Sequence, residues 1–251
     1  MKQQQPSINL IMKGYDTYAV LKGGKNVIKF SDNSDIATDK NPTPIEVAPK
    51  GEKNPIKWIP RGRNNHMPYD IMKKIGTNVT IGSNIEFKNK VVFGDSILVY
   101  RKYRDPKTRK IVKEEVLPYE QPEIFEFLEN NNFNFVRMEL ANDLVIFYDG
   151  YLEYIFNNDN KSPKLVQIKA KESTCSRISE IDEKTGKSEW HGYSAEWHTG
   201  TPTDLIATPL LDRQTPLLDL KMRMGLAPND KGEKIVGKER RFIHNLRIST
   251  P

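Results

Sequence analysis

The residues best suited to chemistry form a short repeat in the last third of the chain. Glu189-Trp190-His191 recurs as Glu196-Trp197-His198, which places two histidines and two carboxylates within ten residues. Imidazole and carboxylate groups are common zinc ligands, and helical metal motifs space them at i and i+4. The two histidines here are seven residues apart, and along a strand an odd separation sends them to opposite faces. We therefore expect no essential metal at this repeat, whose tryptophans suit strands that contribute to a core.

The sequence carries no other pattern typical of a catalytic or cofactor site. The one cysteine, Cys175, has no neighbouring histidine to activate it and cannot form an intramolecular disulfide, which fits a reducing cytosol. Residues 23–25 (Gly-Gly-Lys) lack the Ser or Thr that follows the lysine of a phosphate-binding loop. His66 and His244 are isolated and predict structural or surface roles. We expect no catalytic residue, no cofactor and no enzyme activity.

The basic excess of the chain lies at its two ends. Residues 1–65 carry 11 basic and 6 acidic side chains, residues 213–251 carry 9 and 4, and the middle carries 19 and 23. Basic ends suit the phosphates of a polyanion, but no base-reading motif is present. Any DNA contact should be weak, independent of sequence and sensitive to salt. The candidate residues are Lys238, Arg240 and Arg241, of which a strand would place at most two on one face.

The N-terminal part is predicted to be separate from the main domain. β-Forming residues at 17–21 and 27–30, with two glycines between them, predict a hairpin. Residues 31–57 are polar, contain four prolines and show no apolar periodicity, so we expect an extended arm that wraps on a neighbour or stays mobile. The division is therefore residues 1–57 and residues 58–251. No stretch approaches the ~18 apolar residues of a membrane helix.

The main domain opens with two predicted helices. Pro68, followed by Asp70, is typical of a helix start, and this helix should reach about Ile75. Gly76 should break it, and a second helix should run from residue 79 to residue 94. Three apolar residues of the second helix share nearly one face: Ile81, Ile85 and Val92.

A hairpin and two more helices should follow. Residues 96–101 and 110–116 flank a charged turn and predict a second hairpin, which should protrude. A helix is expected from Pro122 to Glu129, ending at three asparagines. The next helix carries an apolar stripe at i, i+4, i+8 and i+11, formed by Val136, Leu140, Leu144 and Phe147, with Gly150 as its expected left-handed end residue.

Beyond residue 150 the apolar period changes to two, which is typical of strands. We expect strands at residues 151–156, 164–168, 177–181 and 189–193, and a further one at 240–248. Residues 225–238 read as a polar loop. Helices followed by a small antiparallel sheet predict an α+β domain, with β-hairpins and the extended N-terminal arm attached. Its core should combine helix 136–148 with strands 151–156 and 165–168.

Trp58 and the run from Gly62 to Met72 form a Trp-x-x-x-Gly-x-x-Asn-x-x-Pro pattern at the entry to the first helix. Further stretches follow in a set order of helix, glycine and strands: residues 127–132, 143–144, 150–154, 175–178, Trp197 and residues 207–212. This order resembles the portal proteins of tailed bacteriophages and prophages, especially divergent members from Bacteroidetes-type hosts.

The resemblance implies a subunit of a ring at one capsid vertex, through which DNA passes. It further implies partners in other copies of itself, the terminase, and capsid and head–tail proteins, in the cytoplasm of a bacterial host and then in the virion. The family's stem helix and clip are not visible before Pro251, so the chain should be an N-terminal, wing-like part or a reduced relative. The alternative is a phage or mobile-element protein that binds the DNA backbone or a protein partner through its basic ends.

Overall fold

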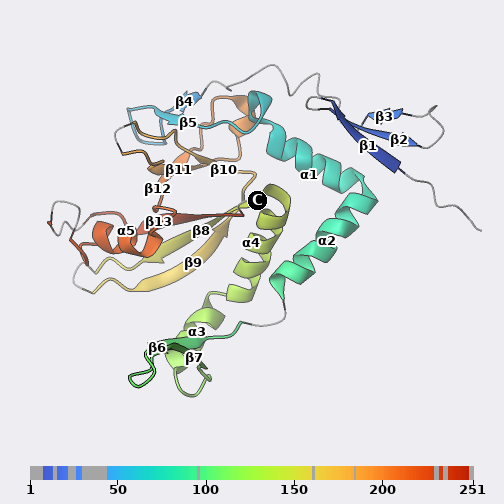
Figure 1. The fold of residues 1–251 in the computed structure, drawn as a ribbon. Coiled ribbons are helices and arrows are strands. Elements are labelled where there is room, and N and C mark those ends of the chain that lie inside the picture. The colour runs from blue at the N-terminus through green and yellow to red at the C-terminus, as the bar shows by residue number, and fades with distance from the viewer. Residues whose placement is uncertain are drawn as a thin grey trace, which may run out of the picture.

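The computed structural model describes residues 8–13, 16–21, 27–29, 44–94, 97–159, 162–183, 185–228, 232–233 and 237–248. The body of the molecule contains two three-stranded antiparallel sheets, with helices packed against one of them (Figure 1). Helices dominate the first half of this body and strands the second half. The α+β class predicted from the sequence is therefore confirmed.

A backbone bridge joins the two three-stranded sheets of the body. Their strand orders are β13-β8-β9 and β10-β11-β12. A parallel bridge joins Leu210, just after β12, to Ile243 in β13, and the Leu211 N–H donates to the Ile243 carbonyl over 2.7 Å. The predicted strands are all present, as β8 (Asp149–Phe156), β9 (Leu165–Lys171), β10 (Ser176–Ile178), β11 (Trp190–Tyr193) and β13 (Arg241–Arg247), together with β12 (Ile206–Pro209).

The predicted core lies between one helix and the first of these sheets. α4 (Phe133–Phe147) follows α3 (Pro122–Asn130) and covers a face of β8 and β9 (Figure 1). Its apolar stripe faces this sheet, because Val136 is buried in one cluster with residues of β8 and β9 and Leu140 packs against that cluster. Burial of such side chains is the main favourable term in folding.

Gly150 has a different role from the one expected. We predicted that it ends α4 in a left-handed conformation, but Tyr148 does so, with φ 56°, and Gly150 belongs to β8. A Cβ atom at Gly150 would lie 2.6 Å from Leu140 Cδ1 and 3.3 Å from Leu144 Cγ. The glycine is therefore needed for the close approach of α4 to β8.

The first two predicted helices are α1 (Met67–Thr77) and α2 (Val79–Phe93), which run along the outside of the body (Figure 1). The break between them falls at Asn78 rather than at Gly76. Asn78 has an extended backbone, and its side chain accepts the N–H of Ile81 over 3.1 Å. An asparagine N-cap therefore starts the second helix, while the glycine is accommodated inside the first.

The apolar face of α2 is exposed. In this helix, all of whose residues the structure describes, none is buried. Ile81 is 42 % exposed and Val92 52 % exposed. Polar contacts help to hold the helix to α4, among them a hydrogen bond of 2.7 Å from Asn89 Nδ2 to Asn142 Oδ1.

Both predicted hairpins are present. β6 (Tyr100–Arg104) pairs with β7 (Ile111–Glu115), and this hairpin extends away from the body in Figure 1. β2 (Asp16–Leu21) pairs with β3 (Val27–Lys29). β1 (Ile8–Lys13), which was not predicted, pairs with β2.

The prediction of an extended arm over residues 31–57 is wrong for the second half of that range. β4 (Ile45–Val47) pairs with β5 (Ile56–Trp58), so β5 runs across the domain boundary placed between residues 57 and 58. The Lys50 N–H donates to the Leu205 carbonyl over 2.9 Å. The few apolar residues of this segment suffice because they pack around the fully buried Trp58. Residues 31–43 lie outside the described residues.

The remaining helical segments are short. They are η1 (Arg63–Asn65), η2 (Trp197–Thr199) and α5 (Pro216–Arg223), and none of them was expected from the sequence. α5 begins at a proline, which fits the first turn of a helix. Among the described residues, no helix combines the length and the apolar character needed to cross a bilayer.

Gly150→Ala tests the packing of α4 on β8. We expect the substitution to lower the free energy of unfolding by about 1–3 kcal/mol, because the added methyl group overpacks against two leucines. Urea denaturation measures the change. Gly76→Ala is the matched control, since nothing lies within 4 Å of its Cβ position and alanine favours a helix by about 1 kcal/mol. Unchanged stability in Gly150→Ala would contradict the packing role.

Candidate functional site

The loop between β5 and α1 contains the pattern that resembles portal proteins. Three of its residues have left-handed backbones: Gly62 with φ 72°, Asn64 with φ 52° and Asn65 with φ 61°. Glycine and asparagine adopt this conformation at the lowest cost. A Cβ atom at Gly62 would lie 2.6 Å from the Cβ of Met67. The tight turn allows Arg61 and Asn65 to reach into the body of the molecule.

Arg61 is the centre of a buried polar network. Its guanidinium forms an ion pair with Asp149, the first residue of β8, whose side chain is 9 % exposed. The Tyr151 hydroxyl donates to the same carboxylate over 2.9 Å, and Asn245 Nδ2 of β13 donates to it as well. Arg61 also donates to the Ser173 carbonyl over 3.2 Å. Arg61 therefore joins the loop to β8 and to the segment after β9, and Asp149 extends the network to Asn245 of β13.

A second arginine, Arg177 of β10, is held mainly by carbonyl groups. It is 1 % exposed, and it donates to the carbonyls of Thr174 over 3.0 Å, Ser176 over 2.7 Å and Asn65 over 3.3 Å. Its guanidinium lies 5.5 Å from the ring centroid of Trp197. Burial, and next the nearby charge of Arg61, lower the pKa of Arg177 to about 10. It therefore stays charged at neutral pH and binds the loop to the second sheet.

His191 lies in the core beside this network. It is 1 % exposed, and its ring centroid is 4.9 Å from that of Tyr151. Neither ring nitrogen has a hydrogen-bond partner among the described residues. Burial, followed by the charges of Lys171 and Arg61, lowers the pKa of His191 to about 3. The imidazole is therefore neutral at physiological pH.

Asp143 of α4 is a carboxyl group whose raised pKa would suit a catalytic acid or base. Burial raises its pKa to about 6, although it accepts the N–H of Ser173 over 2.7 Å. Perturbed pKa values mark functional sites and structural networks alike. The polar groups around Arg61 bond chiefly to one another, so we interpret the cluster as a structural clamp that fixes the loop.

The Glu/Trp/His repeat is divided between the core and the surface. Trp197 is fully buried, and its indole N–H donates to the Cys175 carbonyl over 2.8 Å. His198 is exposed in η2, with its ring centroid 5.4 Å from that of Tyr69, whereas His191 is buried in β11. The two histidines therefore do not face a common point. In the described part of the chain, no group of three or more His, Cys, Asp or Glu side chains is placed to hold a metal.

The three basic residues proposed to contact DNA lie in one short segment at the start of β13. Lys238 is exposed. Arg240 donates to the Gly237 carbonyl over 2.9 Å. The side chain of Arg241 is 64 % exposed, and its Nη1 lies 4.0 Å from Glu153 Oε1. Two of the three side chains therefore already contact oxygen atoms of the chain, which limits what they offer to a phosphate.

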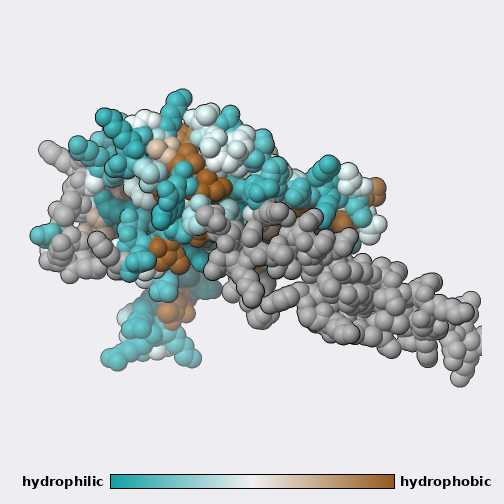
Figure 2. All heavy atoms as spheres, turned by 90° about the horizontal axis from the view of Figure 1, so that it is seen from above, coloured by the Kyte–Doolittle hydropathy of each residue, from teal (hydrophilic) through white to brown (hydrophobic). Residues whose placement is uncertain are grey.

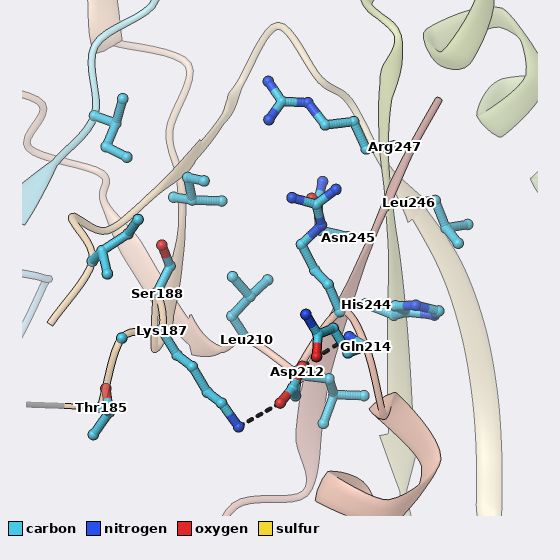
Figure 3. Close-up of a pocket in the computed structure, with 16 residues that line it drawn as sticks. Thr185, Lys187, Ser188, Leu210, Asp212, Gln214, His244, Asn245, Leu246 and Arg247 are labelled. Carbon is cyan, nitrogen blue, oxygen red and sulfur yellow. Dashed lines mark hydrogen bonds and ion pairs between the residues drawn. The ribbon is translucent and has the colours of Figure 1, made fainter. Parts of the chain in front are cut away.

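A cleft of about 770 Å³ opens between β13 and the hairpin that follows β10 (Figure 3). Lys187 reaches across part of it to form an ion pair with Asp212. The rest of the lining combines apolar, cationic and neutral polar residues, among them Ile59, Ile178, Ile181, Arg213, Gln214 and Arg247. The cleft could not be found from sequence patterns, because its residues come from segments far apart in the chain.

A scan against models of protein families found no match, and a search of curated proteins found no similar sequence. The interpretation of the candidate sites therefore rests on their geometry alone. Sequence reasoning missed Arg61, Asp149 and Arg177 as buried partners. The available signal was the glycine and the two asparagines at positions 62, 64 and 65, which tolerate the left-handed turn that directs Arg61 inward.

Arg61→Ala tests the clamp. We expect a loss of about 3–5 kcal/mol in the free energy of unfolding, because the carboxylate of Asp149 stays buried without its ionic partner. Urea denaturation at neutral pH measures the loss. Lys57→Ala is the control, since its ion pair with Glu46 is 58 % and 56 % exposed and should contribute less than about 1 kcal/mol. Equal effects of the two substitutions would show that the buried pair has no special role.

His191 and Asp143 predict opposite dependences of stability on pH. The pKa of His191 is about 3 in the folded protein and 6.5 ordinarily, so its contribution is complete above pH 6.5 and is lost as the pH falls toward 3. The pKa of Asp143 is about 6 in the folded protein and 3.8 ordinarily. Its contribution is complete below pH 3.8 and is lost as the pH rises through 6.

His191→Leu should therefore reduce the loss of stability between pH 6.5 and pH 4, and Asp143→Asn should increase it. Urea denaturation of both variants and the wild type across this range measures the slopes. All other titrating groups are the same in the three proteins. Differences between the slopes of unfolding free energy against pH therefore measure the contributions of His191 and Asp143. Parallel curves for all three would contradict the assigned pKa directions.

Proposed function

We propose that this chain is a portal-like structural subunit of a tailed bacteriophage or prophage, which assembles with copies of itself into a ring through which DNA passes. Support comes first from the residues that carry the resemblance. Trp58 and Asn65 are fully buried, Gly62 has a left-handed backbone and Pro68 is buried at the start of α1. These four residues together form the turn that leads from β5 into α1 and anchor it in the core, so the pattern corresponds to a folded element.

The observation that carries the proposal is the uncovered apolar surface of α2. The exposed fractions are 84 % for Val79, 69 % for Phe87, 66 % for Val91 and 52 % for Val92. Figure 2 shows apolar atoms, in brown, at the end of the molecule where α1 meets α2. A helix with apolar residues on most sides is normally buried. A neighbouring subunit would bury this surface of α2. When the same contact is repeated from copy to copy, the subunits form a closed ring if the rotation between neighbours divides a full turn.

DNA contact through the basic ends is a secondary expectation within this proposal. A portal channel must let DNA slide, so binding should be weak, independent of sequence and sensitive to salt. The internal contacts of Arg240 and Arg241 agree with weak binding. Terminase, capsid and head–tail proteins are further proposed partners.

The test of the proposal is the mass of the assembled protein. One subunit has a mass of 28.9 kDa, and size-exclusion chromatography with light scattering should show a multiple of it that corresponds to a ring. Phe87→Glu combined with Val91→Glu should shift the population toward the monomer, because burial of two charges in an apolar contact is unfavourable.

Ser83→Glu combined with Asn84→Glu is the matched control, since it adds the same two negative charges at exposed polar positions of the same helix. This variant should assemble as the wild type does. A wild-type protein that remains monomeric over the whole concentration range would contradict the proposal. Equal disruption by both variants would show that net charge, and not the apolar surface, governs assembly.

A further inference from the structure

The cleft between β13 and the hairpin after β10 has one wall formed by the edge of a sheet. In the described structure β13 is the outer strand of the order β13-β8-β9. Only the bridge between Leu210 and Ile243 pairs with its other side among the described residues. Beyond Ile243, the last residues of β13 line the cleft. In Figure 3 the side chain of Arg247 points toward it, whereas those of His244 and Leu246 point to the opposite side of the strand.

The hydrogen-bond pattern shows which backbone groups of β13 face the cleft. The Ile248 N–H donates to the Tyr148 carbonyl, and the Phe156 N–H donates to the Arg240 carbonyl. In an antiparallel pair such bonds recur at every second residue. The even-numbered residues of β13 therefore bond to β8, and the N–H and C=O groups of Asn245 and Arg247 point to the other side. Arg247 is exposed and Asn245 is 5 % exposed, so the accessible part of this edge begins at the rim of Asn245 and continues at Arg247. A strand edge with unpaired backbone groups can pair with a further extended chain.

The charge in the cleft is positive. Among the described residues that line it, Asp212 is the only acidic one, and its carboxylate is bound by Lys187 and by the Gln214 N–H over 2.8 Å. Arg213 and Arg247 also line the cleft, and both side chains are exposed. Within the described residues neither arginine forms an ion pair. Figure 3 shows Arg247 projecting over the opening.

Apolar side chains form the wall opposite β13. Ile59 is 37 % exposed and Ile181 is 62 % exposed, and both line the cleft with Ile178. An anion site for a free phosphate would not need isoleucines, and the phosphates of a duplex would leave the strand edge unused. A peptide uses all three features, because it has backbone groups for the edge, carboxylates for the arginines and apolar side chains for the isoleucines.

The geometry points to an extended acidic peptide segment of a partner protein as the ligand of this cleft, bound as an added strand on β13. At roughly 3.3 Å per residue, a segment of about three residues covers the edge from Asn245 to Arg247. Two carboxylates of the segment would meet Arg213 and Arg247 in charge-assisted hydrogen bonds. This inference is independent of ring assembly, which uses α2.

A labelled peptide of alternating glutamate and valine is the probe, and fluorescence anisotropy with the full chain measures binding. We expect the acidic peptide to bind and its lysine–valine counterpart not to bind. Arg213→Gln combined with Arg247→Gln should weaken binding about tenfold or more, the order expected for lost charge-assisted hydrogen bonds. Arg101→Gln combined with Arg104→Gln, on the exposed β6, is the control and should leave binding unchanged.

Amide hydrogen exchange of the wild type tests the strand geometry without any substitution. Bound peptide should slow exchange at Asn245 and Arg247 and leave Leu246, which already bonds to β8, unchanged. Methylation of every second backbone nitrogen of the peptide can be made in two ways. Only the way that blocks the N–H groups facing β13 should abolish binding. Absence of binding, binding insensitive to the two arginine substitutions, or equal competition by inorganic polyphosphate without amide protection would each overturn the inference.

Discussion

The ion pair between Arg61 and Asp149 is the constraint on which the arrangement of the body depends. A buried ion pair adds little stability over well-packed apolar residues, but loss of one partner is costly. Its effect here is on specificity. The carboxylate is satisfied only when the loop after β5, the start of β8 and Asn245 of β13 meet at one point. Alternative registers of these strands would leave a charge buried without partners.

The same network determines where α1 begins. Asn65 Oδ1 accepts the Arg61 N–H over 2.9 Å, and Asn65 Nδ2 lies 3.4 Å from the Trp197 carbonyl. Because this asparagine is fully buried two residues before α1, the position of the helix start is tied to the core. The direction in which α1 leads to α2 along the outside of the body is therefore set by packing inside the body. α2 can therefore be held in place although none of its side chains is fully buried.

Local patterns predicted the parts of the fold whose packing is local. The stripe that contains Val136 and Leu140 faces one neighbour, the sheet of β8 and β9, so periodicity identified it. β8 is buried on both faces, and its apolar and aromatic residues marked it as a strand. β4 and β5 depend on Trp197 and Leu205, which come much later in the chain, so a short polar segment looked like an arm. Arg61 and Asp149 are also distant in sequence, and neither residue type signals a buried partner.

Asn245 connects the clamp to the cleft. Its side chain donates to Asp149, while its backbone groups belong to the strand edge that lines the cleft. A segment added at this edge would extend the sheet without replacing any bond of the clamp. The arginines at the cleft are exposed, so salt should screen their attraction for a ligand, whereas the buried pair should be little affected. The molecule therefore combines a salt-insensitive scaffold with a salt-sensitive recognition surface that shares one of its residues.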